Sequence, residues 1–345
     1  MIPYFRLSSN KKELEELTKV HQNSSWANGE YIKKVEEQLK ILFKKQHVVL
    51  TSNGNSALFV ALKALGIKGQ EVIVPCASTC FAITNAVITS GNKPIFCDVN
   101  ESDGNCNVEH VTRLVKQHNI NYIISANFAG NLSATSEFKK LGLTVIEDAC
   151  QSFHSSLFSS SEADVQVFSF YPTKGINGID GGALVLNDSD LAQKASKLVY
   201  YDDQTSFETS ERYNFRFLNA HAAVLHANLA HIKTTQERLT QIRNSYLATL
   251  QGKKEVNVLT NGNSKISQRF VIYVDESLKA KLNETFKAKQ IALSPFFTWN
   301  CSKEEQIQLV NASKIVNNTF CLPYFEDLSD DEINSVNQAL KHVFT

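Results

Sequence analysis

A lysine that follows a buried-type strand is well suited to covalent chemistry. The segment Val167-Phe-Ser-Phe-Tyr-Pro-Thr-Lys174 surrounds this lysine with turn residues, and the pair Gly181-Gly182 follows it. Such a lysine is poorly placed for a solvated surface role and can lose its proton readily, as an amine that attacks a carbonyl must. We predict that Lys174 is a reactive amine, the alternative being an ordinary loop lysine.

Two other segments place polar groups where predicted strands end. Thr144-Val-Ile-Glu-Asp148 ends in two carboxylates, and strand ends of this kind face the ligand crevice of an open α/β sheet. Asp148 can therefore pair with a cationic ring nitrogen, although aspartate after a strand is also a common helix cap. Thr51-Ser-Asn-Gly-Asn-Ser-Ala-Leu58 opens a helix whose free N–H groups suit a phosphate, again with a simple cap as the alternative.

The three segments together match the requirements of one cofactor. Pyridoxal 5′-phosphate needs an anion cradle, an aspartate beside its pyridinium nitrogen and a lysine that bonds to its aldehyde. We therefore predict this cofactor, and His154 could approach it from just beyond the Asp148 segment. The histidines at 221, 226 and 231 do not share one face of a helix, so we predict no metal site.

The composition limits the classes of partner. The chain of 345 residues has 35 lysines and arginines and 35 aspartates and glutamates, a balance that argues against nucleic acid or an anionic membrane. The apolar runs are too short for a membrane helix and the start lacks the order of a secretory signal, so we expect a cytoplasmic protein. The seven cysteines show neither a Cys-x-x-Cys pair nor zinc spacing, and we interpret them as reduced thiols.

The elements that must position these residues are short apolar runs separated by helical stretches. Runs that are apolar on both faces predict a largely parallel sheet covered on both sides by helices. The predicted strands are His47–Leu50, Glu71–Pro75, Pro94–Val99, Tyr122–Phe128, Thr144–Glu147, Val165–Phe170 and Gly182–Leu186.

Helical periodicity dominates the flanking segments. Apolar residues at three- and four-residue steps predict two amphipathic helices in the first 45 residues, and residues 189–250 are predicted to be mainly helical. The remainder mixes a strand at Arg269–Val274 with helices near Leu278–Lys289 and Ser329–Phe344. We predict an α/β fold with a mostly parallel mixed sheet in a large domain, residues 1–235, and a smaller C-terminal α+β domain, residues 236–345.

Over nearly its whole length the sequence resembles the DegT-type (DegT/StrS) sugar aminotransferases. These are pyridoxal phosphate enzymes of the aspartate aminotransferase fold, fold type I. The matching segments are Asn53-Gly-Asn-Ser-Ala-Leu58 for the phosphate turn N-G-T-x-A-L, Glu147-Asp-Ala-Cys-Gln151 for E-D-x-A-Q, Phe168-Ser-Phe-Tyr-Pro-Thr-Lys174 for F-S-F-x-x-x-K, and Tyr213-Asn-Phe-Arg216 for Y-N-x-R.

The resemblance implies a role for each matched residue. Lys174 bonds to the cofactor and carries the proton, and Asp148 holds the ring nitrogen protonated. Gln151 lies near the ring hydroxyl, and Phe81 is the local candidate for stacking on the ring. The phosphate is held by Gly54, Asn55, Ser56 and Ser169, with Asn214 reaching it from the partner subunit of a homodimer.

The resemblance also implies the reaction. We expect an amino group to move from L-glutamate to a nucleotide-linked keto-deoxysugar in two half-reactions through pyridoxamine phosphate, in deoxysugar or polysaccharide biosynthesis. The segment Asn214-Phe-Arg-x-x-Asn219 favours amination at C4 over C3. Two alternatives are another pyridoxal phosphate reaction and a non-catalytic homologue with a regulatory or structural binding role.

Three departures from the family pattern bear on these roles. Asn55 replaces the usual threonine of the phosphate turn, where an amide can still bond to phosphate. Asn127 stands where a histidine is common, so we assign no general base there. Ser294 stands where an arginine is frequent, which leaves the group that meets an acidic part of the substrate unassigned.

Overall fold

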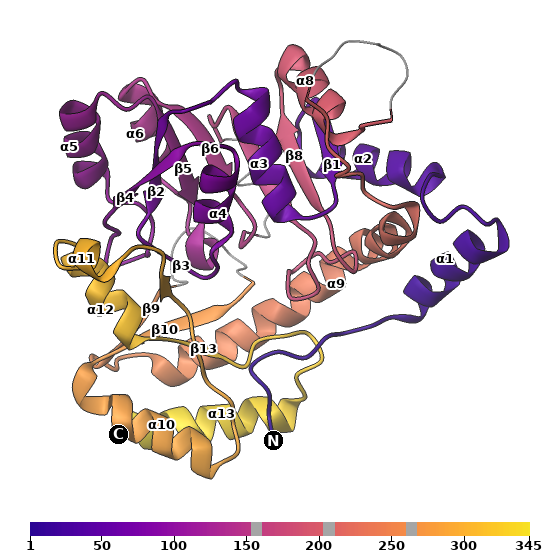
Figure 1. The fold of residues 1–345 in the computed structure, drawn as a ribbon. Helices are drawn as coiled ribbons and strands as arrows, with labels where there is room; N and C mark the ends of the chain where they lie inside the picture. The colour runs from indigo at the N-terminus through magenta and orange to yellow at the C-terminus, as the bar shows by residue number, and fades with distance from the viewer. Residues whose placement is uncertain (153–160, 203–210, 260–267) are drawn as a thin grey trace.

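A seven-stranded sheet forms the centre of the computed structural model, which describes residues 1–152, 161–202, 211–259 and 268–345 (Figure 1). The strand order is β1-β8-β7-β6-β5-β2-β4, and only β8 runs antiparallel to its neighbours in this sheet. All seven predicted strands are confirmed. Their bounds are β1 (His47–Thr51), β2 (Glu71–Pro75), β4 (Lys93–Cys97), β5 (Tyr122–Ala126), β6 (Thr144–Asp148), β7 (Val165–Ser169) and β8 (Gly182–Leu186).

Both faces of the sheet are buried, which explains why its strands are continuous apolar runs. Alternate side chains of a strand point to opposite faces, so Val49 joins one hydrophobic core while Val48 and Leu50 join another. One face is covered by α3 (Gly54–Ala64), α4 (Ala82–Thr89) and α8 (Ser189–Val199). The other is covered by α2 (Glu30–Phe43), α5 (Val108–His118) and α6 (Thr135–Lys140).

The long helix α9 (Asn219–Leu250) runs from the sheet region into the C-terminal part, as Figure 1 shows. The proposed division between residues 235 and 236 lies within this helix. Beyond it, a small antiparallel sheet has the order β11-β13-β10-β9. Its strands are β9 (Val256–Val258), β10 (Phe270–Val274), β11 (Ser294–Pro295) and β13 (Thr319–Leu322), and its helices are α10 (Glu276–Ala288), α11 (Lys303–Gln306), α12 (Val310–Asn318) and α13 (Asp330–Val343).

The N-terminal segment packs against this C-terminal part. Ile2 forms a β-bridge with Ile291, and the ring of Phe5 packs edge-on against Phe325 at 6.4 Å between centroids. Figure 1 shows the N-terminus beside α13, while α1 (Lys11–Gln22) contacts α9. A two-stranded ribbon of β3 (Ala77–Ser78) and β12 (Thr298–Trp299) also links the large sheet region to the C-terminal part.

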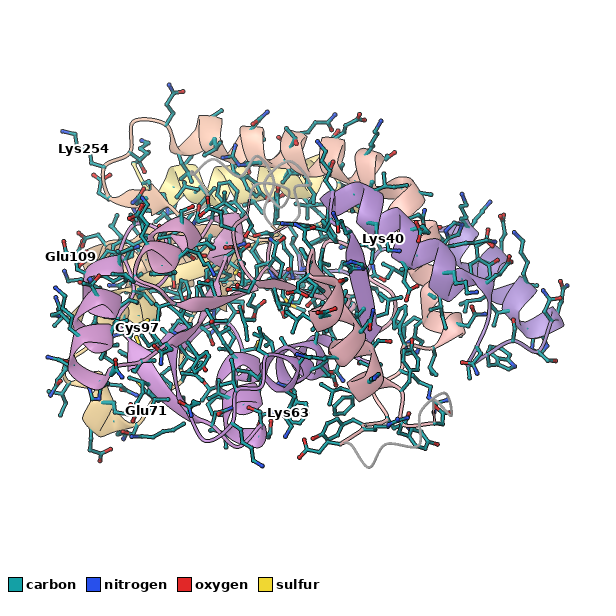
Figure 2. All side chains as sticks on the ribbon, turned by 90° about the horizontal axis from the view of Figure 1, so that it is seen from above. Lys40, Lys63, Glu71, Cys97, Glu109 and Lys254 are labelled. Carbon is teal, nitrogen blue, oxygen red and sulfur yellow. The ribbon has the colours of Figure 1, made fainter. Side chains whose placement is uncertain are left out.

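Charged side chains lie at the periphery and the thiols lie mainly inside. Figure 2 shows Glu109 and Lys254 at the edge of the molecule, whereas Cys97 lies among interior side chains. All seven cysteines are free, and Cys76, Cys97, Cys106 and Cys321 are buried. In the described ranges, no helix combines the length and apolar character that a membrane crossing requires.

A buried carboxylate joins the large sheet to the C-terminal part. Asp98, directly after β4, is 9% exposed, and its Oδ1 accepts a hydrogen bond of 2.9 Å from the backbone N–H of Ala312. Its Oδ2 accepts one of 3.2 Å from the N–H of Asn311. Helix α12 has no capping side chain at its own N-cap, Leu309, so the cap comes from a residue distant in the sequence.

We predict that Asp98→Ala lowers the free energy of unfolding by about 1–3 kcal/mol, because it leaves the first N–H groups of α12 without their acceptor. Asp98→Asn, which keeps one acceptor oxygen, is expected to lose less. Urea unfolding of both variants measures the effect, with the exposed Glu109→Ala as control. Equal stability of Asp98→Ala and wild type would show that the cap contributes nothing.

Candidate active site

A cavity of about 590 Å³ lies where the parallel strands end. The carboxyl ends of β5, β6 and β7 contribute Asn127, Asp148 and Ser169 to its wall. This edge is where open α/β sheets place their ligands, because helices cover both faces. Six of the nine cofactor-binding residues predicted from the sequence line the cavity: Gly54, Asn55, Asp148, Gln151, Ser169 and Lys174.

The N-terminus of α3 forms one wall of the cavity. Asn53 caps the helix through a 2.8 Å hydrogen bond from the N–H of Ser56 to its Oδ1. Glycine is required at the next position, because a Cβ on Gly54 would lie 2.8 Å from the Cβ of Ser169. A Cβ on Gly182 would lie 2.4 Å from the backbone oxygen of Asn53. The close approach of three chain segments therefore presents the helix N-terminus and the Ser169 hydroxyl together, as an anion cradle requires.

Asp148 and Gln151 are held in place by hydrogen bonds to the backbone and to a neighbouring side chain. The Oδ1 of Asp148 accepts a hydrogen bond of 3.0 Å from the N–H of Cys150. The Oε1 of Gln151 accepts one of 3.1 Å from the N–H of Ala129, and its Nε2 donates to the hydroxyl of Thr79. Burial and the neighbouring Asp148 carboxylate raise the pKa of the Cys150 thiol well above its usual range. Cys150 therefore stays protonated near neutral pH and does not compete as a nucleophile.

Lys174 lies in a turn after β7. Its backbone N–H donates a 2.8 Å hydrogen bond to the carbonyl of Tyr171. The loop is closed by a 2.9 Å hydrogen bond from the N–H of Gly178 to the carbonyl of Phe170. The carbonyl of Thr173 also accepts a hydrogen bond from Nε2 of Gln268, a residue of the C-terminal part. The loop that carries the lysine is thus held by hydrogen bonds within itself and by one from the C-terminal part.

These residues fit pyridoxal 5′-phosphate. The cradle at Gly54 is too tight for a side chain, and it shares one cavity with the carboxylate of Asp148 and the amine of Lys174. An anion site, an acid and an amine are the three groups that this cofactor requires. The fit rests on all three being reachable from the same cavity.

The other three predicted residues do not line this cavity. The hydroxyl of Ser56 lies 3.1 Å from that of Ser52, and its N–H is used by the Asn53 cap. Phe81 is 52% exposed at the start of α4. The Oδ1 of Asn214 accepts a hydrogen bond of 3.1 Å from Nε of Arg216 in the same chain. His154 lies outside the described residues.

The two asparagines that depart from the family pattern are engaged in hydrogen bonds. Asn55 donates to the carbonyl of Ala82 at 2.9 Å and accepts from Asn85 at 3.2 Å, so its amide links α3 to α4. Asn127 donates to Glu147 at 2.9 Å and accepts from the N–H of Ser133 at 2.8 Å. Because both polar ends of Asn127 are used, this amide serves to position the strand ends.

Glu147, the buried neighbour of Asp148, organises this part of the wall. It is 3% exposed and accepts hydrogen bonds of 2.8–2.9 Å from four side chains. The four donors come from different segments, so the carboxylate fixes their relative positions and is itself fully hydrogen-bonded. They are Asn127, Thr135, Ser161 and Gln166.

The sequence analysis assigned no role to several residues of the cavity wall, among them Tyr4, Asp180, Gln268 and Arg269. The only available signal was for Arg269, a charged residue at the head of the predicted strand Arg269–Val274. Tyr4 and Gln268 reach the cavity through contacts between segments that are far apart in the sequence. No local pattern marks such residues.

Comparison with known proteins places the chain in a defined family. Residues 8–341 match the model of the DegT/DnrJ/EryC1/StrS aminotransferase family. The chain is 26% identical to a pleiotropic regulatory protein of Geobacillus stearothermophilus, over 99% of this chain and 98% of that protein. It is 26% identical to the 3-oxo-glucose-6-phosphate:glutamate aminotransferase of Bacillus subtilis (99% and 83%), and 25% identical to a UDP-4-amino-4,6-dideoxy-N-acetyl-beta-L-altrosamine transaminase of Campylobacter jejuni (99% and 96%).

The fold is also found among solved structures. The crystal structure of NtdA from Bacillus subtilis with bound PMP superposes with a TM-score of 0.90 at 23% identity, covering 99% of this chain and 84% of that one. The fold is thus that of the fold type I pyridoxal phosphate enzymes. With the family model matching nearly the whole chain, the protein belongs to the DegT/DnrJ/EryC1/StrS family of pyridoxal phosphate-dependent aminotransferases.

Proposed function

We propose that this aminotransferase moves the amino group of L-glutamate to the ketone of a nucleotide-linked deoxysugar. The observation that carries the proposal is the single cavity in which the Gly54 cradle, Asp148 and Lys174 meet. When bound there, pyridoxal phosphate supplies an electron sink for the carbanion that forms at the substrate carbon. The protein must then hold the phosphate, protonate the ring nitrogen and move one proton at the reacting carbon.

Lys174 moves that proton. Lys174 is the lysine of the described cavity wall, and Gln268, across the cavity, donates a hydrogen bond to the carbonyl of the residue before it. An amine held beside the reacting carbon acts as base in one half-reaction and as acid in the other. A ping-pong mechanism needs such a reversible proton carrier, since the two half-reactions run the same step in opposite directions.

Asp148 and the cradle hold the cofactor. We assign Oδ2 of Asp148 to the proton of the ring nitrogen, because the N–H of Cys150 already fixes Oδ1. A carboxylate beside a ring N–H⁺ keeps the nitrogen protonated. Gln151, which Thr79 and Ala129 orient, is assigned to the ring hydroxyl. The N-terminus of α3 and Ser169 are assigned to the phosphate.

Both substrates are supported by the names of relatives. The Bacillus subtilis relative uses glutamate and the Campylobacter jejuni relative is named for a UDP-linked sugar, which supports glutamate as donor and a nucleotide sugar as acceptor. We propose amination at C4, which the Asn214–Asn219 segment favours. The name of the Bacillus subtilis relative, by contrast, specifies a 3-oxo sugar. We propose deoxysugar or polysaccharide biosynthesis in the cytoplasm as the setting. The cytoplasm is a reducing compartment, which is compatible with seven free cysteines.

A homodimer completes the proposed site. Asn214 does not line the cavity of its own chain, where it is bonded to Arg216. We propose that it reaches the phosphate of the partner subunit. Several large apolar side chains near the site are exposed and would be buried by such a partner. They include Phe81 at 52%, Tyr171 at 52% and Ile179 at 45% exposure.

The second candidate is a regulatory role without catalysis. It is favoured by the name of the Geobacillus stearothermophilus relative, a pleiotropic regulatory protein. Lys174 and Asp148 lining the same cavity argue for catalysis, since a binding protein does not need a reactive amine. Cofactor uptake and its response to L-glutamate distinguish the two roles.

For the reaction itself, we predict that Lys174→Ala abolishes amino transfer, by at least about 10²–10⁴-fold, while leaving the protein folded. The visible absorbance of the wild-type protein with pyridoxal phosphate should change when L-glutamate is added, and the variant should lack the lysine-bound absorbance. Circular dichroism controls for folding. Turnover of the variant at the wild-type rate would contradict the assignment of Lys174, and absence of cofactor uptake by the wild type would favour the regulatory role.

For the cradle, we predict that Gly182→Ala weakens pyridoxal phosphate binding on the order of tenfold or more, because the new Cβ pushes against the backbone of Asn53. Titration of apoprotein with cofactor measures this. Gly29→Ala is the matched control, since its Cβ would lie 2.4 Å from Nδ2 of Asn219 and neither residue lines the cavity. A loss of affinity that is equal in both variants would point to a general packing defect.

For the dimer, we predict that Asn214→Ala weakens cofactor binding and that mixing it with Lys174→Ala restores one site. In the mixed dimer, one cavity combines the intact Lys174 of one subunit with the intact Asn214 of the other. Activity after mixing, together with mass by sedimentation, measures the effect. A monomer, or no recovery in a confirmed mixed dimer, would show that Asn214 does not act across subunits.

A further inference from the structure

Four charged side chains line the cavity in the described part of the chain. Among the described residues that line it, the acids are Asp148 and Asp180, and the cations are Lys174 and Arg269. The proposed reaction uses Lys174 as the covalent and proton-carrying amine. An anionic part of a substrate therefore has one other cation to meet in this wall, which is Arg269.

Arg269 is well placed to bind an oxyanion. It directly precedes β10 on the C-terminal side of the cavity and is half-buried. Its guanidinium lies over the ring of Tyr4 at 5.6 Å and over that of Phe5 at 5.0 Å from the centroids. Burial lowers the pKa of Arg269, yet a guanidinium stays charged in proteins. Stacking on aromatic faces orients its planar fork, which matches the geometry of a carboxylate.

A second group in the same wall, the side-chain amide of Gln268, is available to bind a ligand. Gln268 is 8% exposed and lines the cavity beside Arg269. Its Nε2 donates to the carbonyl of Thr173, the residue before Lys174. Its buried Oε1 has no hydrogen-bond partner within the described ranges. A buried acceptor without a partner costs free energy, which a ligand with an N–H or O–H donor would recover.

We propose that Arg269 binds a carboxylate of the amino donor, and that Gln268 offers its Oε1 to a donor group of the same ligand. This inference rests on the proposed function. A dicarboxylic donor brings negative charge into a cavity that already holds Asp148 and Asp180, so a cation must compensate for it. A sugar ring is neutral and makes no such demand, although a phosphate attached to it would share the chemistry of the carboxylate.

The link from Gln268 to Thr173 makes this wall suitable for the donor. It joins the anion-binding side of the cavity to the loop that carries Lys174. A donor held by its carboxylate at Arg269 therefore lies on the same side as the residue before the reactive amine. Arg269 is thus a binding residue for the donor. Its loss should raise the half-saturating concentration of the donor more than it lowers the limiting rate.

The test uses the enzyme loaded with pyridoxal phosphate and the variants Arg269→Met and Arg269→Lys. Methionine keeps an aliphatic chain for packing on Tyr4 and Phe5, and lysine keeps the charge. The control is Arg238→Met, since Arg238 is paired with Asp330 at 2.9 Å and does not line the cavity. The first measurement is the dissociation constant of glutarate, a dicarboxylate that cannot react, by calorimetry. The second is the half-saturating concentration of L-glutamate for the change in cofactor absorbance.

Arg269→Met is expected to weaken glutarate binding and raise the half-saturating L-glutamate concentration by about 10- to 100-fold. Arg269→Lys should recover part of the loss, and Arg238→Met should match the wild type. Unchanged glutarate affinity in Arg269→Met would overturn the proposal. So would a defect confined to the keto-sugar half-reaction, which would assign Arg269 to a phosphate. If wild-type absorbance does not respond to L-glutamate, the proposed donor fails, and glutarate binding still decides whether Arg269 binds carboxylates.

Discussion

The coverage of both faces of the seven-stranded sheet is the constraint on which the site depends. The central strands are buried on both sides and leave little polar surface along their length, so the polar groups that can meet a ligand lie where the strands end. The parallel strands β5, β6 and β7 end at the same edge and deliver Asn127, Asp148 and Ser169 there. The cavity is thus a consequence of strand direction.

Two kinds of contact hold this edge in shape. The first is close backbone approach, in which Gly54 and Gly182 allow the start of α3 to press against β7 and β8. The second is the buried carboxylate of Glu147, which joins four side chains behind the strand ends. Close packing and a fully satisfied polar network both resist local rearrangement, so the groups facing the cavity keep fixed relative positions.

The C-terminal part closes the cavity and supplies the proposed means of recognising the donor. Asp98 fastens α12 to the large sheet, and the N-terminal segment carries Tyr4 and Phe5 to the guanidinium of Arg269. The groups assigned to the cofactor come from the large sheet region, whereas the group assigned to the donor comes from the opposite wall. One part can therefore retain the cofactor while the other distinguishes substrates.

The sequence by itself determined the strands, the fold class and the residues whose spacing marks pyridoxal phosphate chemistry, because buried strands and strand-end turns have local patterns. Lys174, Asp148 and Gly54 belong to such patterns, and the structure brings them to one cavity. Only the tertiary structure decided that the Ser56 hydroxyl lies against that of Ser52. It also decided that the Asn127 amide is hydrogen-bonded to Glu147 and Ser133. The opposite wall, which includes Tyr4, Gln268 and Arg269, was likewise set by the tertiary structure. Those placements depend on contacts between segments far apart in the chain, which no local pattern encodes.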